Sequence, residues 1–242
     1  MKRKHGIDRA YCRNTGQGGS KRIPKKNIKP FCGKPIISYS IEAALASGLF
    51  DKVIVSTDSE DIASVAAGCG AEVPFVRPAR LSDDYTGTNE VTKHAIQWYN
   101  TRGTEISYAC CIYATAPFLQ PVYLKEGYEK LVKFDKSFAF SVTSFAFPIQ
   151  RAVRITEDGW VDAIHPENNM TRSQDLEEAY HDAGQFYWGS AQSFLNDVTT
   201  FSPASVPIIL PRYHVQDIDT EEDWERAELM FLTWQKMQGR SG

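Results

Sequence analysis

The sequence predicts an α/β protein, a three-layer α/β/α sandwich built on a mostly parallel sheet. Short β-branched runs alternate along the chain with amphipathic helical patterns, as expected for repeated strand–helix units. The run YACCIYAT at 108–115 is almost continuously apolar, which is typical of a central strand covered on both faces. No Gly-, Ser- or Pro-rich linker divides the chain, so we expect residues 1–242 to form a single domain.

The spacing of apolar residues and of capping residues predicts each element. Gly48 ends the first helix and Ser59 caps the second, while Thr220 and Asp223 form a capping box at the start of the last one. In chain order, we expect a helix at 35–50, a strand at 51–57, a helix at 59–70, a strand at 71–76, a helix at 86–103, a strand at 108–115, a helix at 122–134, strands at 137–145 and 206–211, and a helix at 220–238.

The pattern loosens between the strand at 137–145 and the aromatic segment that follows residue 180. Residues 145–180 contain several turn signals, including HPENN, and one short run, DLEEAY at 175–180, that we interpret as a helix. We expect this stretch to be an insertion with its own local structure that serves in dimerisation.

Composition and charge exclude several classes of protein. The chain has 42% hydrophobic and 24% charged residues with a formal net charge of −3, which excludes disordered and low-complexity classes. A chain of 242 residues buries enough surface to fold without disulfides or a structural metal. The mild acidity argues against a protein dedicated to nucleic-acid binding, in which a basic surface would dominate.

Cysteine usage and the apolar runs indicate the compartment. The five cysteines are odd in number and lack C-x-x-C spacing, so they indicate neither a disulfide framework nor a zinc site. The start, MKRKHGID, lacks the apolar segment of a signal peptide, and no apolar run approaches the ~20 residues of a membrane span. We therefore expect a soluble, cytoplasmic protein with no membrane partner.

A basic loop near the start is the most informative segment. Gly18 and Gly19 allow close backbone approach, so that main-chain N–H groups can point at an anion. Five cations follow within nine residues: Lys21, Arg22, Lys25, Lys26 and Lys29. The spacing fits neither GxxxxGK[ST] nor GxGxxG. A solvated basic loop is the alternative, but glycines ahead of the cations favour binding of a triphosphate.

An acidic pair near the end of the chain suggests a metal site. Asp217 and Asp219 are two residues apart, so on an extended segment both carboxylates face the same way. Two carboxylates with open positions are typical of Mg²⁺ sites that also hold substrate phosphates. The alternative is an acidic helix start, in which the carboxylates at 221–223 complement the helix dipole.

Three further polar residues have two interpretations each. Ser56 and Asp58 follow a predicted strand, where ligands gather in parallel sheets, so they either meet a ribose or base or cap the next helix. Arg77 precedes a proline turn. Its guanidinium group either donates a pair of hydrogen bonds to a carbonyl or phosphate, or it lies on the surface without a ligand.

Other catalytic patterns are missing from the sequence. It contains no HExxH, no i,i+4 histidine pair and no G-x-S-x-G elbow, which argues against a histidine metal site and a serine nucleophile. The aromatic residues at 186–188 and Tyr180 indicate mainly core packing. One edge of this cluster could line a sugar-binding pocket.

Six segments together resemble a known enzyme family. GGSKRIPKKNIKPFCGKPII, VIVSTDSEDIA, RPARLSDDYTG, IYATAPF, RSQDLEEAYHDAGQFYWG and VQDIDTEEDW are similar, in order and spacing, to the sialic-acid cytidylyltransferases over about residues 18–232. The resemblance implies a nucleotide-diphospho-sugar transferase-like, Rossmann-like fold and a homodimer. It implies the reaction of CTP with a nonulosonic acid to give a CMP-sugar and pyrophosphate, with flagellin glycosylation as the consuming pathway.

The resemblance also implies roles for individual residues. CTP would be held by Gly18, Gly19, Ser20, Lys21, Arg22, Lys26, Asn27, Asp58, Arg77 and Thr88. The sugar would contact Tyr113, Thr115, Arg172, Gln185, Phe186 and Tyr187. Asp217 and Asp219 would bind Mg²⁺, while Lys21, Arg22 and Asp219 would be the catalytic residues, the first two offsetting phosphate charge and Asp219 helping to deprotonate the sugar hydroxyl.

Two departures from the sialic-acid enzymes concern the sugar. The family's glutamine before P-T-S-P is absent where this chain reads YATAP at 113–117, and N-G-A-I-Y is replaced by AGQFY at 183–187. A site without these polar groups is expected to reject N-acetylneuraminate. Both variants resemble the pseudaminate branch; CMP-N-acetylneuraminate and CMP-ketodeoxyoctonate synthesis are the alternatives.

The segment before the basic loop departs from the family. Residues 6–17, GIDRAYCRNTGQ, are too polar for a central parallel strand. Codons for residues 14–17, read one base later, can encode the Ile-Pro-Ala-Arg that the family has there. One hypothesis is therefore a pair of compensating frame errors in the gene. Resequencing of the gene would test this hypothesis. A divergent N-terminus is the alternative, and with it a non-catalytic CTP-binding relic.

Overall fold

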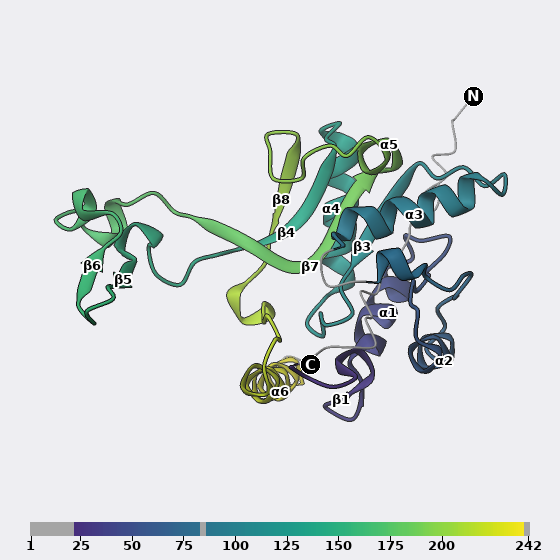
Figure 1. Cartoon of the computed structure of the whole chain (residues 1–242), viewed down its shortest axis with the longest axis horizontal. Coiled ribbons are helices and arrows are strands. Elements are labelled where there is room, and N and C mark those ends of the chain that lie inside the picture. Colours follow the sequence, from purple (N-terminus) through teal and green to yellow (C-terminus); the bar gives the residue numbers. More distant parts are fainter. Residues whose placement is uncertain (1–21, 83–85, 240–242) are drawn as a thin grey trace.

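The computed structural model describes residues 22–82 and 86–239. They form a body and a long arm that leaves it on one side (Figure 1). The helices are α1 (Ile36–Ser47), α2 (Glu60–Gly68), α3 (Thr88–Asn100), α4 (Pro121–Lys133), α5 (Ala191–Leu195) and α6 (Glu221–Gln238). The strands are β1 (Pro30–Phe31), β2 (Lys34–Pro35), β3 (Tyr108–Ile112), β4 (Phe138–Ser144), β5 (Val153–Ile155), β6 (Val161–Ala163), β7 (Tyr180–Ser190) and β8 (Ser205–Ile209).

The central sheet is mixed. Its described strands have the order β3-β7-β4-β8, with β4 and β8 parallel. Strand β7 lies between β3 and β4 and is antiparallel to both. The prediction of a mostly parallel sheet is therefore only partly right, because β3, β4 and β8 share one direction while β7 opposes them. The cause is the arm: the chain leaves the body after β4 and returns beside it, which forces the returning strand to run the opposite way.

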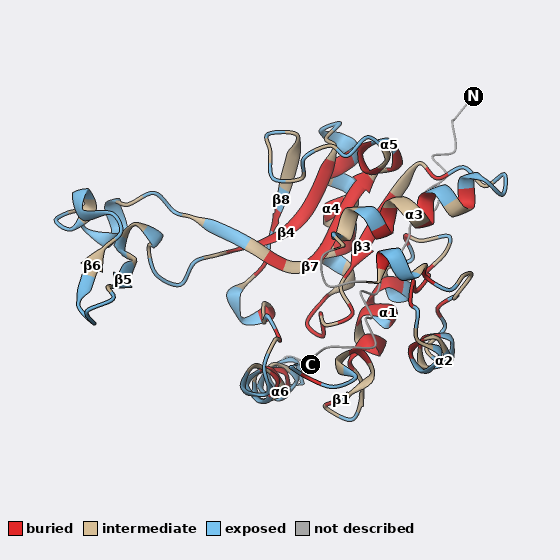
Figure 2. Ribbon diagram, in the orientation of Figure 1, coloured by how far each residue is buried: buried red, intermediate tan, exposed pale blue. Residues whose placement is uncertain are grey.

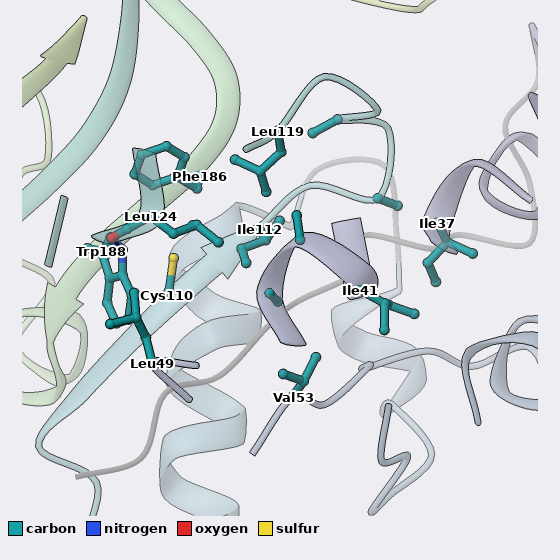
Figure 3. Close-up of a cluster of buried hydrophobic side chains, with 14 of the residues drawn as sticks. Ile37, Ile41, Leu49, Val53, Cys110, Ile112, Leu119, Leu124, Phe186 and Trp188 are labelled. Carbon is teal, nitrogen blue, oxygen red and sulfur yellow. Dashed lines mark hydrogen bonds between the residues drawn. The ribbon is translucent and has the colours of Figure 1, made fainter. Parts of the chain in front are cut away.

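Helices cover both faces of this sheet, as the predicted three layers require. Cys110 and Trp188 point to the face covered by α1, α2 and α4, and form a cluster with Leu124 (Figure 3). Ala109 and Phe138, from alternate positions of the strands, pack with α3 and α5 on the other face. Figure 2 shows the buried residues concentrated in the strands between these helices. The alternation follows from the two-residue period of side chains along a strand.

Two predicted strands, at 51–57 and 71–76, do not form. The segments pair only through isolated parallel bridges, Ile54 with Glu72 and Thr57 with Val76. The Val55 N–H donates to the Glu72 carbonyl at 2.8 Å. Pro74 lacks an N–H and interrupts the ladder between the two bridges. The 53–57 segment is nevertheless buried, as the apolar run predicts.

The helix signals are confirmed at both ends of the chain. Gly48, with φ 64°, ends α1 in the left-handed conformation. The capping box at α6 forms as predicted, with the Asp223 N–H donating to the Thr220 hydroxyl at 3.2 Å. The apolar face of α6, centred on Trp224, packs edge-on against Phe31 of the β1–β2 hairpin. Within the described ranges, we find no helix both long and apolar enough to cross a membrane.

Residues 145–180 form the arm. The pair β5–β6 lies at its tip, far from the body (Figure 1). The helix predicted at 175–180 is wrong: a 3₁₀ turn ends at Asp175, residues 176–179 are irregular, and Tyr180 already belongs to β7. A six-residue helix has few internal hydrogen bonds and needs packing on one face, which the exposed arm does not supply.

A buried histidine makes the stability of the fold sensitive to pH. A hydrogen bond of 2.9 Å joins His214 Nδ1 to the Tyr123 hydroxyl. The buried Nε2 of His214 has no hydrogen-bond partner among the described residues. Burial lowers the pKa of His214. The unfolded chain therefore binds more protons below pH ~6.5, and the free energy of unfolding should fall as pH drops through that value.

Urea unfolding at pH 7.5, 6.5 and 5.5 measures this loss. H214Q should show a smaller loss of unfolding free energy across the series than the wild type, and H165Q, changed on the exposed arm, should match the wild type. An equal pH slope in H214Q and wild type would contradict the assignment.

Candidate active site

A cavity of about 970 Å³ opens where the chain leaves β3, enters β7 and approaches α6. We call it the main cavity. Its lining combines charged and small residues from these distant segments: Arg22, Tyr113, Thr115, His181, Asp182, Ala183, Gly184, Val215, Gln216, Asp217, Asp219, Thr220, Asp223 and Arg226. Predicted triphosphate, sugar and metal residues are therefore brought together in one place.

The acidic pair lines this cavity, and two cations contact Asp219: Arg22, which also lines the cavity, and Lys26, which does not. Arg22 Nη2 lies 3.1 Å from Asp219 Oδ2, and Lys26 Nζ lies 3.3 Å from Asp219 Oδ1. Lys26 also donates to the Ile218 carbonyl at 2.6 Å. Partial desolvation raises the pKa of Asp217, and the negative charge of Asp219 raises it further. A divalent cation bound between the two carboxylates would relieve this repulsion and would share Asp219 with Arg22 and Lys26.

The cations in the described part of the basic loop pair with acidic residues. Lys25, in the left-handed conformation with φ 51°, pairs with Asp61 at 2.7 Å, and Lys29 pairs with Glu221 at the start of α6. Asn27 is buried within this loop. The predicted phosphate-binding residues Gly18, Gly19, Ser20 and Lys21 lie outside the described residues.

Arg77 is buried, which rules out the interpretation of a surface arginine. Its side chain is 1% exposed, its Nε donates to the Ser82 hydroxyl at 3.0 Å, and its Nη2 lies 3.3 Å from Asp58 Oδ1. Ser59 rather than Asp58 caps α2. The Ser56 hydroxyl is buried and lacks a hydrogen-bond partner in the described part of the chain. Ser56 is fully buried and Asp58 pairs with Arg77, and none of these three residues lines either cavity described in this section.

A second cavity of about 430 Å³ adjoins the main cavity. Tyr113 and Asp182 line both cavities. The hydroxyls of Thr88 and Tyr113 are 3.1 Å apart, and Tyr187 donates its hydroxyl to Asp182 Oδ2. Burial raises the pKa of Tyr187 far above its usual range, so this hydroxyl stays protonated and acts as a donor. Thr88, Tyr113 and Tyr187 therefore lie together on the wall of the second cavity.

Three predicted sugar contacts are not placed at either cavity. Phe186 is completely buried in the core, next to Leu124 and Trp188 (Figure 3), because it faces opposite to Tyr187 on β7. Gln185 is also buried, and its Nε2 donates to the His214 carbonyl at 2.5 Å. Arg172 lies on the arm, where Nε pairs with Asp175 at 2.7 Å.

The structure adds lining residues that sequence reasoning missed. Arg226 lines the main cavity from α6 and bonds Asp223, one turn earlier, at 2.7 Å. Their i,i+3 spacing after the acidic pair was a usable signal. His181 and Asp182 join the site through the pairing of β7 with β4, which no local pattern announces.

Comparison with known proteins decides the family. A family model described as "Cytidylyltransferase" matches residues 17–227. The chain belongs to this cytidylyltransferase family. The matched range of this cytidylyltransferase begins at the basic loop. It contains the acidic pair and every residue that lines the two cavities.

The sequence identity between this cytidylyltransferase and its relatives differs from one relative to another. It is 46% identical over 220 residues to the "Pseudaminic acid cytidylyltransferase" of Campylobacter jejuni, covering 91% of this chain and 95% of that protein. It is 35% identical over 220 residues to the "N-acylneuraminate cytidylyltransferase" of Oncorhynchus mykiss, covering 89% and 49%. A solved CMP:2-keto-3-deoxy-manno-octonic acid synthetase with CTP shares the fold, with a TM-score of 0.66, 14% identity, and 93% and 99% coverage.

Proposed function

We propose that this cytidylyltransferase transfers CMP from CTP to the anomeric hydroxyl of pseudaminic acid. The observation that carries the proposal is the 46% identity, over nearly the full length of both chains, to a relative named for that sugar. Identity to the N-acylneuraminate relative is lower, at 35%. The sequence departures at 113–117 and 183–187 also favour pseudaminic acid over N-acetylneuraminate. No comparison supports a non-catalytic relic.

Charged residues in and beside the main cavity support this reaction. The anomeric oxygen forms a bond to the α-phosphorus of CTP as the bond from that phosphorus to pyrophosphate breaks. Arg22 and Lys26 are positioned to offset charge that develops on the phosphates. We assign Asp219 to accept the proton of the hydroxyl. Asp217 and Asp219 would hold Mg²⁺, which supplies additional positive charge to the triphosphate.

A pyrophosphate-release assay tests the proposed function. The full chain is mixed with CTP and Mg²⁺ and with pseudaminic acid, N-acetylneuraminic acid or ketodeoxyoctonic acid at matched concentrations. We expect the highest kcat/KM with pseudaminic acid. Equal or better turnover of another sugar would contradict the assignment of pseudaminic acid as the substrate. Absence of pyrophosphate release with all three sugars would instead support the non-catalytic alternative.

We further propose that the arm mediates a homodimer. Several large apolar side chains are exposed on it, among them Phe147, Trp160 and Met170, at 83%, 72% and 95%. Such a surface is typical of a protein interface. A second copy would also explain why Arg172, predicted to contact the sugar, lies on the arm between β6 and β7 and lines neither the main cavity nor the second cavity.

Replacing Trp160 with lysine should weaken this dimer. A charge in the centre of an apolar interface must lose water on association, so we expect W160K to raise the dimer dissociation constant at least tenfold. Sedimentation velocity over a concentration series measures it. L229K, altered at a similarly exposed position on α6, is the control. A monomeric wild type, or unchanged association of W160K, would contradict the proposal.

The cytoplasm is the compartment we propose. None of the described cysteines, Cys32, Cys69, Cys110 and Cys111, is in a disulfide, in keeping with a reducing environment.

A further inference from the structure

Asp182 occupies a position between the two cavities that the proposed chemistry does not yet use. It lies on β7, where the strand emerges from the body toward the arm, and lines both the main cavity and the second cavity. Tyr113, which also lines both, stands beside it at this junction. Any ligand that extends from the main cavity into the second one must pass these two side chains.

The carboxylate of Asp182 is held from two sides. The Gly184 N–H donates to Oδ1 at 2.9 Å, and the Tyr187 hydroxyl donates to Oδ2. Tyr187 is itself buried and packs against Phe140, with ring centroids 5.8 Å apart, so the hydroxyl is fixed in place. Gly184 has a φ of 61°, which turns its N–H back toward the carboxylate. A group held this firmly is preorganised to bind a ligand.

Within the described residues, the hydrogen bonds to the Asp182 carboxylate come from neutral donors. In the described parts of the chain, 22–82 and 86–239, no lysine, arginine or histidine forms an ion pair with Asp182. Each carboxylate oxygen has two lone pairs and uses one, so each can accept one more hydrogen bond. CTP and the carboxylate of a nonulosonic acid are both anionic and are repelled here. The groups that fit are uncharged donors on the opposite side of the sugar.

The lining of the second cavity, beside Asp182, indicates which donor group of the sugar fits there. The second cavity combines the apolar side chains of Val198 and Phe201 with the hydroxyl groups of Thr88 and Thr199. An acylamino group matches such a lining, because its methyl group is apolar, its carbonyl accepts a hydrogen bond and its N–H donates one. Pseudaminic acid carries two acylamino groups, whereas N-acetylneuraminic acid carries one.

We propose that Asp182 is a specificity-determining residue that accepts a hydrogen bond from an acylamino N–H of the sugar, with Tyr187 as its positioning residue. This inference rests on the proposed function and names the residue that reads its substrate. Asparagine at 182 keeps the size of the side chain but removes its charge, and replaces one acceptor oxygen with a donor that opposes the N–H.

The experiment measures steady-state kinetics of the full chain, with CTP and sugar varied separately. D182N should raise the KM for pseudaminic acid about 10- to 100-fold, the range for a lost hydrogen bond to a charged group, while KM for CTP stays within about twofold. Asp135→Asn, the same chemical change in an exposed loop after α4, should leave both KM values unchanged. Equal melting temperatures of D182N and wild type establish that the variant is folded.

A second variant separates positioning from direct contact. Y187F should raise the same KM about 3- to 10-fold by freeing the carboxylate, and should add less than twofold in the D182N background, because both changes act through one group. A sugar KM within threefold of wild type in D182N would overturn the proposal, as would a loss of kcat alone or a joint rise of both KM values. Wild-type turnover of pseudaminic acid, measured in the same assay, tests the proposed function separately.

Discussion

Replacing Asp217 with asparagine is expected to lower kcat for pyrophosphate release by about 10²- to 10³-fold, the scale of losing one electrostatic anchor of the transition state. Asp217 and Asp219 face the same cavity, and together they would place Mg²⁺ against the triphosphate. An asparagine retains the shape of the side chain but contributes one neutral oxygen. The loss should be only partly recovered by raising the Mg²⁺ concentration.

The same variant should not lose stability. Desolvation and the charge of Asp219 raise the pKa of Asp217, which means that its ionised form is unfavourable in the folded, metal-free protein. D217N should therefore melt at or slightly above the wild-type temperature without Mg²⁺. E225Q, at an exposed position on α6, serves as the control and should retain full activity. Activity of D217N within threefold of wild type would refute the metal assignment.

Trp188→Ala should produce the largest loss of stability, about 3–5 kcal/mol in the free energy of unfolding. The indole is fully buried, stacks on Phe50 with centroids 5.0 Å apart, and donates from Nε1 to the Leu124 carbonyl at 3.0 Å. Gly127 leaves room for it, because a Cβ there would lie 2.8 Å from the ring. Alanine creates a cavity and removes the additional hydrogen bond that the indole donates to α4.

Urea unfolding at neutral pH measures this loss. Leu229→Ala is the matched truncation of an exposed apolar residue on α6, and should change the free energy of unfolding by less than about 0.5 kcal/mol. A Trp188→Ala variant within about 1 kcal/mol of the wild type would show that the core cluster of Figure 3 relaxes into the space.

Features encoded by neighbouring residues could be predicted from the sequence. The end of α1 at Gly48 and the capping box of Thr220 and Asp223 depend on interactions within one or two turns, and both form as expected. The acidic pair was recognised for the same reason, since Asp217 and Asp219 need only their spacing to face one way. The basic loop was found from its cluster of charges.

Features set by distant pairing could not be predicted. The direction of β7 depends on where the chain re-enters the sheet, and the bulge between Phe140 and Val142 shifts the register that brings Asp182 to the cavity. Sequence similarity grouped Phe186 with Tyr187 as sugar contacts, but adjacent residues on a strand face opposite sides. The helix expected at 175–180 does not form, and the segment instead lies beside residues 145–150, where the Phe145 N–H donates to the Ala179 carbonyl at 3.1 Å and Gln150 Nε2 donates to the Glu177 carbonyl at 2.9 Å.

The place of β7 in the sheet also dictates an order of events during synthesis. Strands β3 and β4 have no ladder with each other, because β7 lies between them. A nascent chain therefore carries both strands, and the whole arm, before residues 180–190 leave the ribosome and join them. Such long-range closure is slow. Until it occurs, β3 and β4 each present an unpaired edge, so the growing chain depends on chaperones or on its covering helices to avoid aggregation.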